Sequence, residues 1–567
     1  MKARIPSGMI RQCKELGTSF EIDAKDLAFY ERISPVFGGK RFLIPPPTLS
    51  PEARNRRRLT FRNERTLYRR RCDKTGQHIV SIYAPEAPFP VYDHDYWFSD
   101  DWDAKSYGRE FDFTRPFFEQ FAELAKVVPM YSLYQQRNNE NSPYTNLGSG
   151  NRNCYYVFAG SDNEDCYYST YIQRCQDVSD SFFIFDSELC YECIDCYHCY
   201  NTTFLQDCEN CTDSHYLTGC IGCSNCFGCV SLIKATYCIF NEQYSKAEYE
   251  KQIAQILSLS NSAEFVATNI GKLTAEVPRK FYSGNDIETS TGDHLAHCKS
   301  AENCFDCTNL EECKNCTWLH QCTNCYDCYA WGLKGELGLE NHLVGANFYN
   351  VMFSEMCSRD VSELLYCRAC YGNCMNLFGC IGLKQTQYAI LNRPYSKEQY
   401  ELLVPQIIEH MRKTGEWGEF FPQWLSPFGY NETVAAEYFP LSRAEVIAKG
   451  WNYRDEPLPG VYGEIAIPWN MVTSLLESVS EELLGKIFCC ETSGKNFRYT
   501  KGELALYKKL KVLPPKNCFD ARYRRRFERR NPRKLVEREC LQCGETILSS
   551  YAADRPEQVV CERCFRY

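Results

Sequence analysis

The stretch that decides the fold is residues 190–230, which read CYECIDCYHCYNTTFLQDCENCTDSHYLTGCIGCSNCFGCV. Its cysteines recur at a fixed interval, which continues upstream and downstream. Cysteines whose numbers differ by 18 include Cys175, Cys193, Cys211 and Cys229, and also Cys190, Cys208 and Cys226. Fixed-period columns of small and apolar residues are typical of a solenoid, in which each coil stacks its inward side chains on the last. The sequence therefore predicts a mainly β fold, a parallel β-helix with coils of about 18 residues.

A shorter interval of three residues separates many neighbouring cysteines, as in Cys190, Cys193 and Cys196. Straight strands do not produce this spacing, because their side chains alternate with a period of two. We therefore expect short strands with a bend between them. Asp177, Asp195 and Asp213 recur at the same long interval as the cysteines and are expected at such a bend.

The cysteine-rich centre is itself duplicated. The segment from Phe227 to Glu250 matches the segment from Phe378 to Glu401 at an offset of 151, whereas an earlier match has an offset of 129. The extra chain implied by these two offsets is expected to be a loop at 332–351. Each half is expected to close with a helix, because Ser245 and Ser396 have capping-box spacing ahead of an amphipathic run.

The two ends of the chain are copies of each other as well. Residues 13–30 align without gaps to 490–507, and residues 47–98 align to 515–566. The sequence thus predicts a solenoid in two halves, bracketed by duplicated ribbon-like modules and a few flanking helices. The expected segments are a degenerate ribbon-like module with a basic arm (1–98), a helical connector (99–138), the first (139–275) and second (276–414) solenoid halves with their closing helices, an aromatic-rich connector (415–477), and a ribbon-like module ending in an intact zinc ribbon (478–567).

The most specific chemical motif is at the C-terminus, where Cys540 and Cys543 are followed by Cys561 and Cys564. Two such thiolate pairs can close a tetrahedral zinc site, each pair on a tight turn. Gly544 follows the first pair, where the backbone favours a residue without a side chain. We expect one structural zinc ion here; unliganded thiols or another metal are the alternative.

The equivalent positions elsewhere have lost most of their cysteines. The sets are Cys72, Thr75, Asp93 and Tyr96; Cys13, Leu16, Ser50 and Ala53; and Cys490, Ser493, Cys518 and Ala521. One or two thiols do not hold zinc tetrahedrally, so these copies are expected to be free of metal and held by packing. A weaker alternative for the first set is a site made by Cys72, Asp93 and His94.

Both ends show one further pattern: RQCKELGTSF, KDLAFY and PPTLSPEARNRRR in the first copy, and CCETSGKNF, GELALY and PPKNCFDARYRRR in the second. These motifs resemble the "probable zinc-ribbon" family. Over its whole length the chain is similar to an uncharacterised family of cysteine-rich zinc-ribbon proteins from small, mostly uncultivated bacteria. The resemblance implies a ribbon fold at both ends and no established activity.

Two arginine-rich arms lie beside the ribbons. Residues 54–71 contain nine Arg and one acid, Glu64, and residues 522–534 contain seven Arg, Lys534 and one acid, Glu528. Arginines interleaved with aromatic residues are typical of contacts with phosphates and bases, although a solvated amphipathic helix has the same pattern. The candidate nucleic-acid-binding residues are Arg56, Arg57, Arg58, Arg69, Arg70, Arg71, Arg522, Arg524, Arg525, Arg526, Arg529 and Arg530.

The central cysteines leave a second metal hypothesis open. Two runs have four cysteines at intervals of three, Cys190, Cys193, Cys196 and Cys199, and Cys220, Cys223, Cys226 and Cys229. They resemble an iron–sulfur run, but its last interval and its proline are missing. We favour packed reduced thiols, because a buried cysteine behaves as a small hydrophobe. Bound zinc, an iron–sulfur cluster or disulfides are the alternatives.

Composition sets the remaining limits. The chain has 567 residues, 36 of them cysteines, with 44% hydrophobic and 24% charged residues and a net charge of -9. No apolar run approaches the roughly 20 residues needed to span a bilayer, and the first residues lack a signal-peptide core. We therefore expect a cytoplasmic protein that does not engage a membrane.

No catalytic motif stands out. The predicted function is a non-enzymatic zinc-binding scaffold that contacts RNA, DNA or a ribonucleoprotein; the alternatives are metal or redox handling and a protein-interaction platform.

Overall fold

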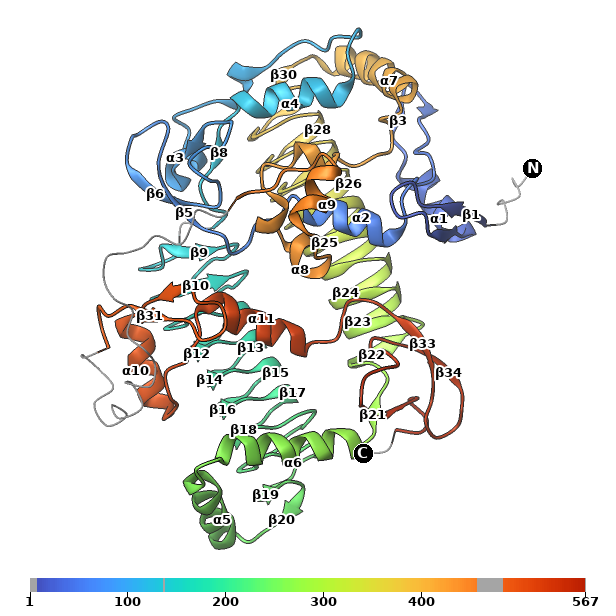
Figure 1. Cartoon of the computed structure of the whole chain (residues 1–567). Helices are drawn as coiled ribbons and strands as arrows, with labels where there is room; N and C mark the ends of the chain where they lie inside the picture. The colour runs from blue at the N-terminus through green and yellow to red at the C-terminus, as the bar shows by residue number, and fades with distance from the viewer. Residues whose placement is uncertain (1–7, 136–137, 456–482, 566–567) are drawn as a thin grey trace. The chain divides into compact units, whose positions relative to one another are not determined.

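The computed structural model describes residues 8–135, 138–455 and 483–565, and the chain divides into two compact units (Figure 1). Unit 1 comprises Met1–Leu133, Tyr282–Arg454 and Arg533–Leu535, and unit 2 comprises Tyr134–Phe281, Asp455–Pro532 and Val536–Tyr567. Each unit combines one end of the chain with a β-rich segment that is distant in sequence. Within the described residues, every helix is too short or too polar to cross a lipid bilayer.

Unit 2 contains a series of short parallel strands, which we call the first ladder (residues 144–239). Apart from the first pairing, of Tyr144 with Tyr155 at an offset of 11, its strands pair at an offset of 12: Thr170 with Phe182, Phe182 with Ile194, and Ile194 with Gln206. Isolated bridges continue this offset as far as Ile239. The strands are β9 (Tyr144–Asn146), β10 (Tyr155–Phe158), β11 (Thr170–Gln173), β12 (Gln176–Ser179), β13 (Phe182–Phe185), β14 (Glu188–Tyr191), β15 (Ile194–Tyr197), β16 (Tyr200–Thr203), β17 (Gln206–Glu209) and β18 (Thr212–His215).

The first ladder is built from three-residue steps. Every third residue has a left-handed backbone, as at Arg174 (φ 52°) and Asp177 (φ 53°), and the residue after it is buried, as at Cys175 and Val178. One turn of the ladder therefore has four short sides, each with one buried side chain. Asp and Asn tolerate left-handed backbone better than most residues do. The predicted bend is confirmed at Asp195 (φ 52°) as at Asp177.

The predicted coil length is wrong, because the strands pair at an offset of 12 and not of 18. The longer interval is one and a half turns, so Cys175 and Cys193 do not stack on each other. The residues that stack are those at the shorter offset, as in the directly paired Cys196 and Cys208. Because a buried position recurs every three residues, any multiple of three aligns cysteines in the sequence, and only the strand pairing selects the true turn.

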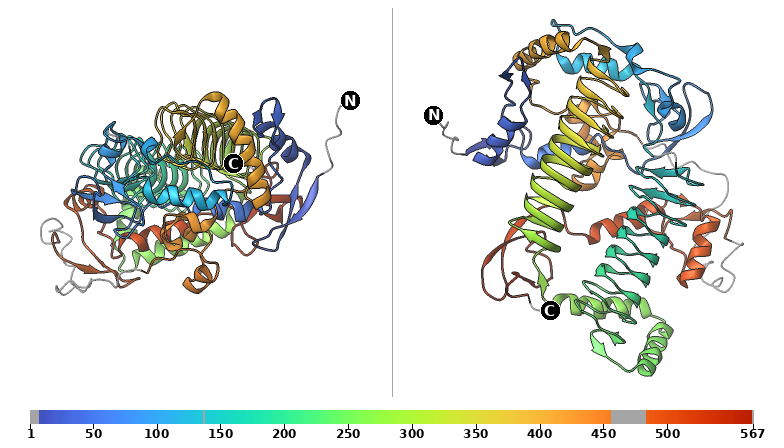
Figure 2. Two further views of the ribbon diagram at one scale, coloured as in Figure 1. Left: turned by 90° about the horizontal axis from the view of Figure 1, so that it is seen from above. Right: turned by 180° about the vertical axis from the view of Figure 1, so that it is seen from behind.

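Unit 1 contains the second ladder (residues 284–390), which is also parallel. Its strands are β22 (Gly284–Glu288), β23 (Gly292–Glu302), β24 (Cys304–Lys314), β25 (Thr317–Gly345), β26 (Phe348–Met352), β27 (Val361–Leu365), β28 (Met375–Phe378) and β29 (Gln387–Ile390), and β30 (Arg393–Pro394) then pairs antiparallel with β29. Figure 2 shows these strands stacked in a regular series, drawn in green to yellow.

The offset in the second ladder is 11 between β22 and β23, 12 from β23 to β25, 13 from β25 to β28, and 12 again between β28 and β29. Gly292 pairs with Cys304, whereas Phe348 pairs with Val361. The additional residue lies at corners with two successive left-handed residues, as at Ala346 and Asn347 (φ 52° and 57°). The loop expected at 332–351 was wrong: these residues belong largely to β25 and β26. The insertion therefore lengthens the ladder.

The predicted closing helices are confirmed. After the first ladder, β19 (Cys238–Ile239) and β20 (Glu242–Gln243) form a hairpin, followed by α5 (Lys246–Ser258) and α6 (Ser262–Glu276). After the second ladder comes α7 (Lys397–Thr414). Ser245 and Ser396 cap α5 and α7 in capping boxes. The predicted helical connector contains α4 (Phe117–Val127), with Pro116 as its N-cap.

Both ends of the chain contain, in the same order, a hairpin, two helices, a second hairpin and a short strand; the first copy has a further hairpin between its two helices. The first copy contains β1 (Met9–Gln12), β2 (Ser19–Ile22), α1 (Ala24–Ile33), β3 (Val36–Phe37), β4 (Lys40–Arg41), α2 (Pro51–Leu59), β5 (Tyr68–Arg71), β6 (His78–Ser81), β7 (Val91–Tyr92) and α3 (His94–Phe98), and then η1 (Ala104–Tyr107) and β8 (Met130–Tyr131). The second contains β31 (Phe488–Cys489), β32 (Asn496–Phe497), α10 (Lys501–Leu510), α11 (Phe519–Arg529), β33 (Val536–Glu539), β34 (Thr546–Ser549) and β35 (Val559–Val560). We call these the N-terminal and C-terminal modules.

The aromatic-rich connector packs into unit 1 over the part that is described, 415–455; the rest of the expected segment lies outside the described residues. Phe421 stacks on Phe121 of α4, and Phe420 meets Phe61 edge to face. The elements of this part are η2 (Gln423–Leu425), η3 (Tyr430–Glu432), α8 (Val434–Tyr438) and α9 (Arg443–Ala448). In unit 2, β21 (Arg279–Lys280) follows α6 and pairs with β35.

Candidate functional sites

The four C-terminal cysteines come together as a compact group. Cys540 follows β33, Cys561 follows β35, and all four ligand atoms lie within 4.8 Å of one another. Cys543 and Cys561 have their sulfur atoms 3.7 Å apart. Gly544, with φ 71°, closes the first turn by donating its amide to the Cys540 carbonyl. These residues can hold one metal ion.

Within this group, the surroundings of Cys540 favour its thiolate form. Burial of Cys540 opposes ionisation, but amides of Cys561, Cys543 and Gln542 point at the sulfur and lower its pKa to about 6. The donated amide of Cys561 is 3.2 Å from the Cys540 sulfur. A metal replaces protons on such thiols, so a thiol that ionises readily suits a metal ligand.

The eroded copies keep the turn without the ligands. At the N-terminal module, the amides of Thr75 and Asp93 donate to the Cys72 sulfur at 3.4 and 3.2 Å. His94 directs Nδ1 to the Leu133 carbonyl oxygen, 3.1 Å away. In the described part of the chain, none of the eroded sets brings three ligand atoms together. The turn thus persists where the four thiols do not.

The arginines of α11 point into the first ladder of unit 2. Asp180 accepts hydrogen bonds from both Arg522 and Arg526, the latter at 3.0 Å, and Arg526 also donates to Glu192 at 3.0 Å. Arg522, Arg526, Asp180 and Glu192 are at most 3% exposed. Just past the helix, Arg530 makes a two-pronged contact with Asp195, at 2.8 and 2.9 Å. The helix is therefore fixed to the ladder by buried ion pairs.

The arginines of α2 make the same kind of contact with the second ladder in unit 1. Arg54 lies 2.8 Å from Asp327, and Arg58 lies 3.5 Å from Asp327 and 3.4 Å from Glu340. Arg57 donates to both oxygens of Glu340 at 3.0 Å. Burial lowers the pKa of Arg54, but its interactions with Asp327, Tyr30 and Glu340 together outweigh burial, so that the net shift is upward.

The two sets of ion pairs have the same arrangement. Arg54 and Arg58 align with Arg522 and Arg526 in the duplicated modules, and each pair meets carboxylates on successive turns of a ladder. Glu192 follows Asp180 at an offset of 12, the offset at which β12 pairs with β14, and Glu340 follows Asp327 at an offset of 13, the offset at which β25 pairs with β26. All four acids occupy left-handed corners: their φ angles are 52°, 55°, 55° and 45°.

The remaining candidate arginines have varied surroundings. Arg56 is buried beside Glu15, at 2.7 Å, and Arg70 is buried beside Asp73, at 2.8 Å. Arg529 is half-buried, and burial lowers its pKa. The exposed members of the set are Arg69, Arg71, Arg524 and Arg525; of these, Arg71 donates to the Gly76 carbonyl and Arg525 to Glu192.

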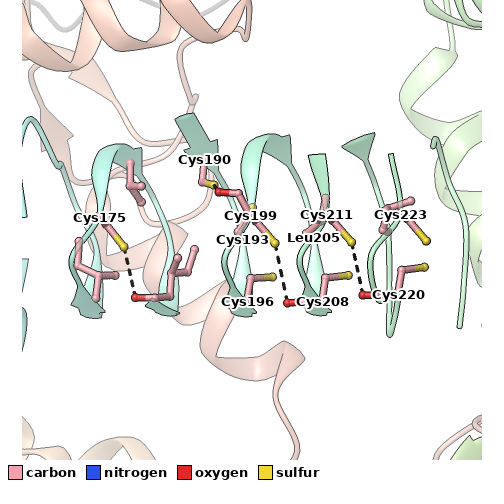
Figure 3. Close-up of a cluster of buried hydrophobic side chains, with 14 of the residues drawn as sticks. Cys175, Cys190, Cys193, Cys196, Cys199, Leu205, Cys208, Cys211, Cys220 and Cys223 are labelled. Atoms are coloured by element: carbon pink, nitrogen blue, oxygen red, sulfur yellow. Dashed lines mark hydrogen bonds between the residues drawn. The ribbon is translucent and has the colours of Figure 1, made fainter. Parts of the chain in front are cut away.

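The central cysteines fill the ladders. Cys190, Cys193, Cys196 and Cys199 are the four consecutive inward residues of one turn, and Cys220, Cys223, Cys226 and Cys229 are those of another. Figure 3 shows the sulfur atoms in rows that run from one turn to the next, as for Cys196, Cys208 and Cys220. In the described part of the chain, no three of these sulfur atoms come as close together as the four at the C-terminus do.

Hydrogen bonding explains the preference for cysteine at inward positions. The Cys211 thiol lies 3.4 Å from the Glu209 carbonyl oxygen of its own turn and 3.5 Å from the Cys220 carbonyl oxygen of the next. A thiol is a small hydrophobe that can donate to such carbonyls. Burial raises the pKa of Cys175 to about 12, which keeps that thiol protonated. All 36 cysteines lie in the described residues, and none is in a disulfide.

Sequence reasoning identified the four-cysteine group but missed Asp180, Glu192, Asp327 and Glu340 as partners of the arginines. These four acids could have been recognised in the sequence as two pairs separated by one turn of the ladder, each acid at a left-handed position. Recognising them requires the true turn length. No protein-family model matches this chain, and no curated protein matches it either.

Proposed function

We propose that this chain is a non-enzymatic, zinc-binding scaffold built on two parallel β-solenoids, each held by the arginine-rich helix of a ribbon-like module. Pairing at offsets of 12 and 13 supports the solenoids. The observation that carries the proposal is the stacking of Asp180 and Glu192 on successive turns beneath α11, repeated by Asp327 and Glu340 beneath α2. Carboxylates buried against guanidinium groups serve to fix one element on another.

Zinc is the metal that we propose for Cys540, Cys543, Cys561 and Cys564. Four thiolates in two pairs suit tetrahedral zinc, and such closed sites are structural. The site would order the C-terminal module around β21, because Ser549 donates to the Phe281 carbonyl and β35 pairs with β21. The resemblance of both modules to the "probable zinc-ribbon" family supports the same assignment.

Metal analysis of the full chain tests this assignment. We expect one zinc per chain, lost in Cys561→Ser and retained in the matched control Cys518→Ser, which changes the equivalent position of the upstream half-module. Several metal ions per chain that survive Cys561→Ser, or the visible absorbance of an iron–sulfur cluster, would contradict it. That outcome would favour metal handling by the central cysteines.

As partner we propose RNA, DNA or a ribonucleoprotein, contacted by the exposed arginines of the arms. Guanidinium groups at a surface bind phosphates through paired hydrogen bonds. Arg524 is exposed and has no ion-pair partner among the described residues, which makes it the best single candidate. The buried arginines contribute to binding only by holding the modules in place.

The nucleic-acid part is tested by measuring the affinity of the full chain for single-stranded RNA and duplex DNA over a range of salt concentrations. Arg524→Gln is expected to weaken binding and to reduce the salt slope by about one phosphate contact, whereas Arg524→Lys retains the slope. Thermal unfolding should be the same in both variants, since Arg524 is exposed. An unchanged affinity in Arg524→Gln would remove this residue as a contact.

A further inference from the structure

The first half of the C-terminal module retains two cysteines that face each other. Cys490 follows β31, and Cys518 is the N-cap of α11. They are 2% and 6% exposed. Ser493 joins them: its amide donates to the Cys490 sulfur at 3.4 Å, and its hydroxyl lies 3.5 Å from the Cys518 sulfur.

The two thiols also interact directly and are inequivalent. Burial raises the pKa of Cys518, and the hydrogen bond that it shares with Cys490 raises it further. Burial opposes ionisation of Cys490 too, but hydrogen bonds from Ser493, Cys518 and Thr492 outweigh it and lower its pKa to about 7. At neutral pH, Cys490 is therefore partly a thiolate beside a protonated thiol. This is the arrangement of an attacking cysteine and its resolving partner.

This pair lacks the remaining ligands of a zinc site, since Ser493 and Ala521 occupy the other two positions. We propose that Cys490 and Cys518 are a redox-active dithiol that hydrogen peroxide converts reversibly into a disulfide. Peroxide suits this site because it is nearly as small as water and both sulfurs are almost buried. The disulfide would tie the first turn of the module to the start of α11, the helix that carries Arg522 and Arg526.

The chemistry proceeds in two balanced steps. The Cys490 thiolate attacks one oxygen of the peroxide, the O–O bond breaks, hydroxide leaves, and Cys490 becomes a sulfenic acid. The Cys518 sulfur then attacks the Cys490 sulfur, the S–O bond breaks, and the thiol proton with the leaving hydroxide forms water. Two thiols and one peroxide thus give one disulfide and two waters, with two electrons passing from sulfur to oxygen.

The chain contains a matched internal control. Cys13 aligns with Cys490, but Ser50 stands where Cys518 stands in the other copy. Burial opposes ionisation of Cys13, yet hydrogen bonds to Ser50 lower its pKa overall, as hydrogen bonds do at Cys490. With no resolving thiol at that position, Cys13 should pass from sulfenic to sulfinic acid under peroxide.

The test is peroxide titration of the full chain carrying Cys489→Ser, which removes the exposed neighbouring thiol. Free thiols are then alkylated, and tryptic peptides are mapped by mass spectrometry. We expect the peptides 487–495 and 517–522 to appear joined, to separate on treatment with a thiol reductant, and to form while one zinc per chain is retained. Cys518→Ser should shift Cys490 to sulfinic acid, the product seen at Cys13.

Three results would overturn the proposal. The first is over-oxidation of Cys490 while Cys518 is still present and reduced. The second is that both cysteines stay reduced at peroxide concentrations that already oxidise Cys13. The third is a fall in metal content in Cys490→Ser, which would assign the pair to a metal ion. Because the joined peptides are detected in a chain that retains both cysteines, the main result does not depend on how well the serine variants fold.

Discussion

Helices α2 and α11 have equivalent places in the two modules, but their arginines differ in exposure. Arg56 is buried, donates to Glu15 and lies over the ring of Trp451. Arg524, which aligns with Arg56, is exposed. The covering residue Trp451 belongs to the connector that packs on the N-terminal module within unit 1. At this equivalent position, Arg56 therefore has partners inside the protein, whereas Arg524 faces solvent.

Two positions behave alike in both copies. Arg54 and Arg522 each contact the first acid of a stacked pair, Asp327 or Asp180, and Arg58 and Arg526 bridge that acid to the second one on the next turn. The arginines of one helix therefore have at least two roles. Those that face stacked carboxylates attach the helix, and only those that face solvent are available to an acidic partner. Removal of one member of a buried ion pair leaves the other charge uncompensated. Substitutions at the arginines that attach the helix should therefore destabilise the protein most.

The largest difference between the modules should come from metal removal. A chelator is expected to abolish amide-exchange protection across β33 and β34, because a four-thiolate ribbon depends on its metal for folding. The equivalent hairpin, β5 and β6, should retain its protection, since Cys72 is the sole cysteine of its set. Hydrogen exchange with mass spectrometry measures both hairpins in one sample. Equal loss in both hairpins would contradict the assignment of the metal to one module.

Removal of a stacked acid should have the next largest effect. Asp180→Ala leaves Arg522 and Arg526 buried without their shared acceptor, and we expect the free energy of unfolding of unit 2 to fall by about 3–5 kcal/mol. Asp327→Ala should act similarly on unit 1. The control Asp186→Ala removes a pair with the half-exposed Arg174 and should reduce stability by less than about 1 kcal/mol. Urea denaturation, followed by hydrogen exchange at α11 and α2, measures each effect. A loss below about 1 kcal/mol in Asp180→Ala would mean that the stacked acid does not hold α11.

A smaller effect should separate the two divergent arginines. Arg56→Ala removes a charged hydrogen bond and leaves Glu15 without its partner, so we expect a loss of about 2 kcal/mol. Arg524→Ala, at an exposed position, should change stability by no more than about 0.5 kcal/mol. Thermal unfolding of the two variants side by side gives the difference. Equal losses would mean that the exposed arginine is also an attachment residue.

Contacts between residues close in the sequence were predicted, whereas contacts between residues distant in the sequence were missed. The four cysteines of the candidate metal site lie in two local pairs, and their convergence was predicted correctly. The closing helices were also predicted correctly, because Ser245 and Ser396 cap them locally. The turn length was not, because three-residue steps align cysteines at every multiple of three. The partners of the arginines were missed because Arg58 and Glu340 are 282 residues apart, and only the fold brings them together.

The most direct test of the account is a double-mutant cycle between Arg526 and Asp180 in the full chain, with Arg526→Gln, Asp180→Asn and the double variant. The free energy of unfolding of unit 2 is measured for each by urea denaturation. If the helix is held by this pair, the two changes should be coupled by at least about 1.5 kcal/mol, since they share one buried contact. Effects that add to within about 0.5 kcal/mol would contradict the claim that the arginine helix is fixed to the ladder by its stacked acids.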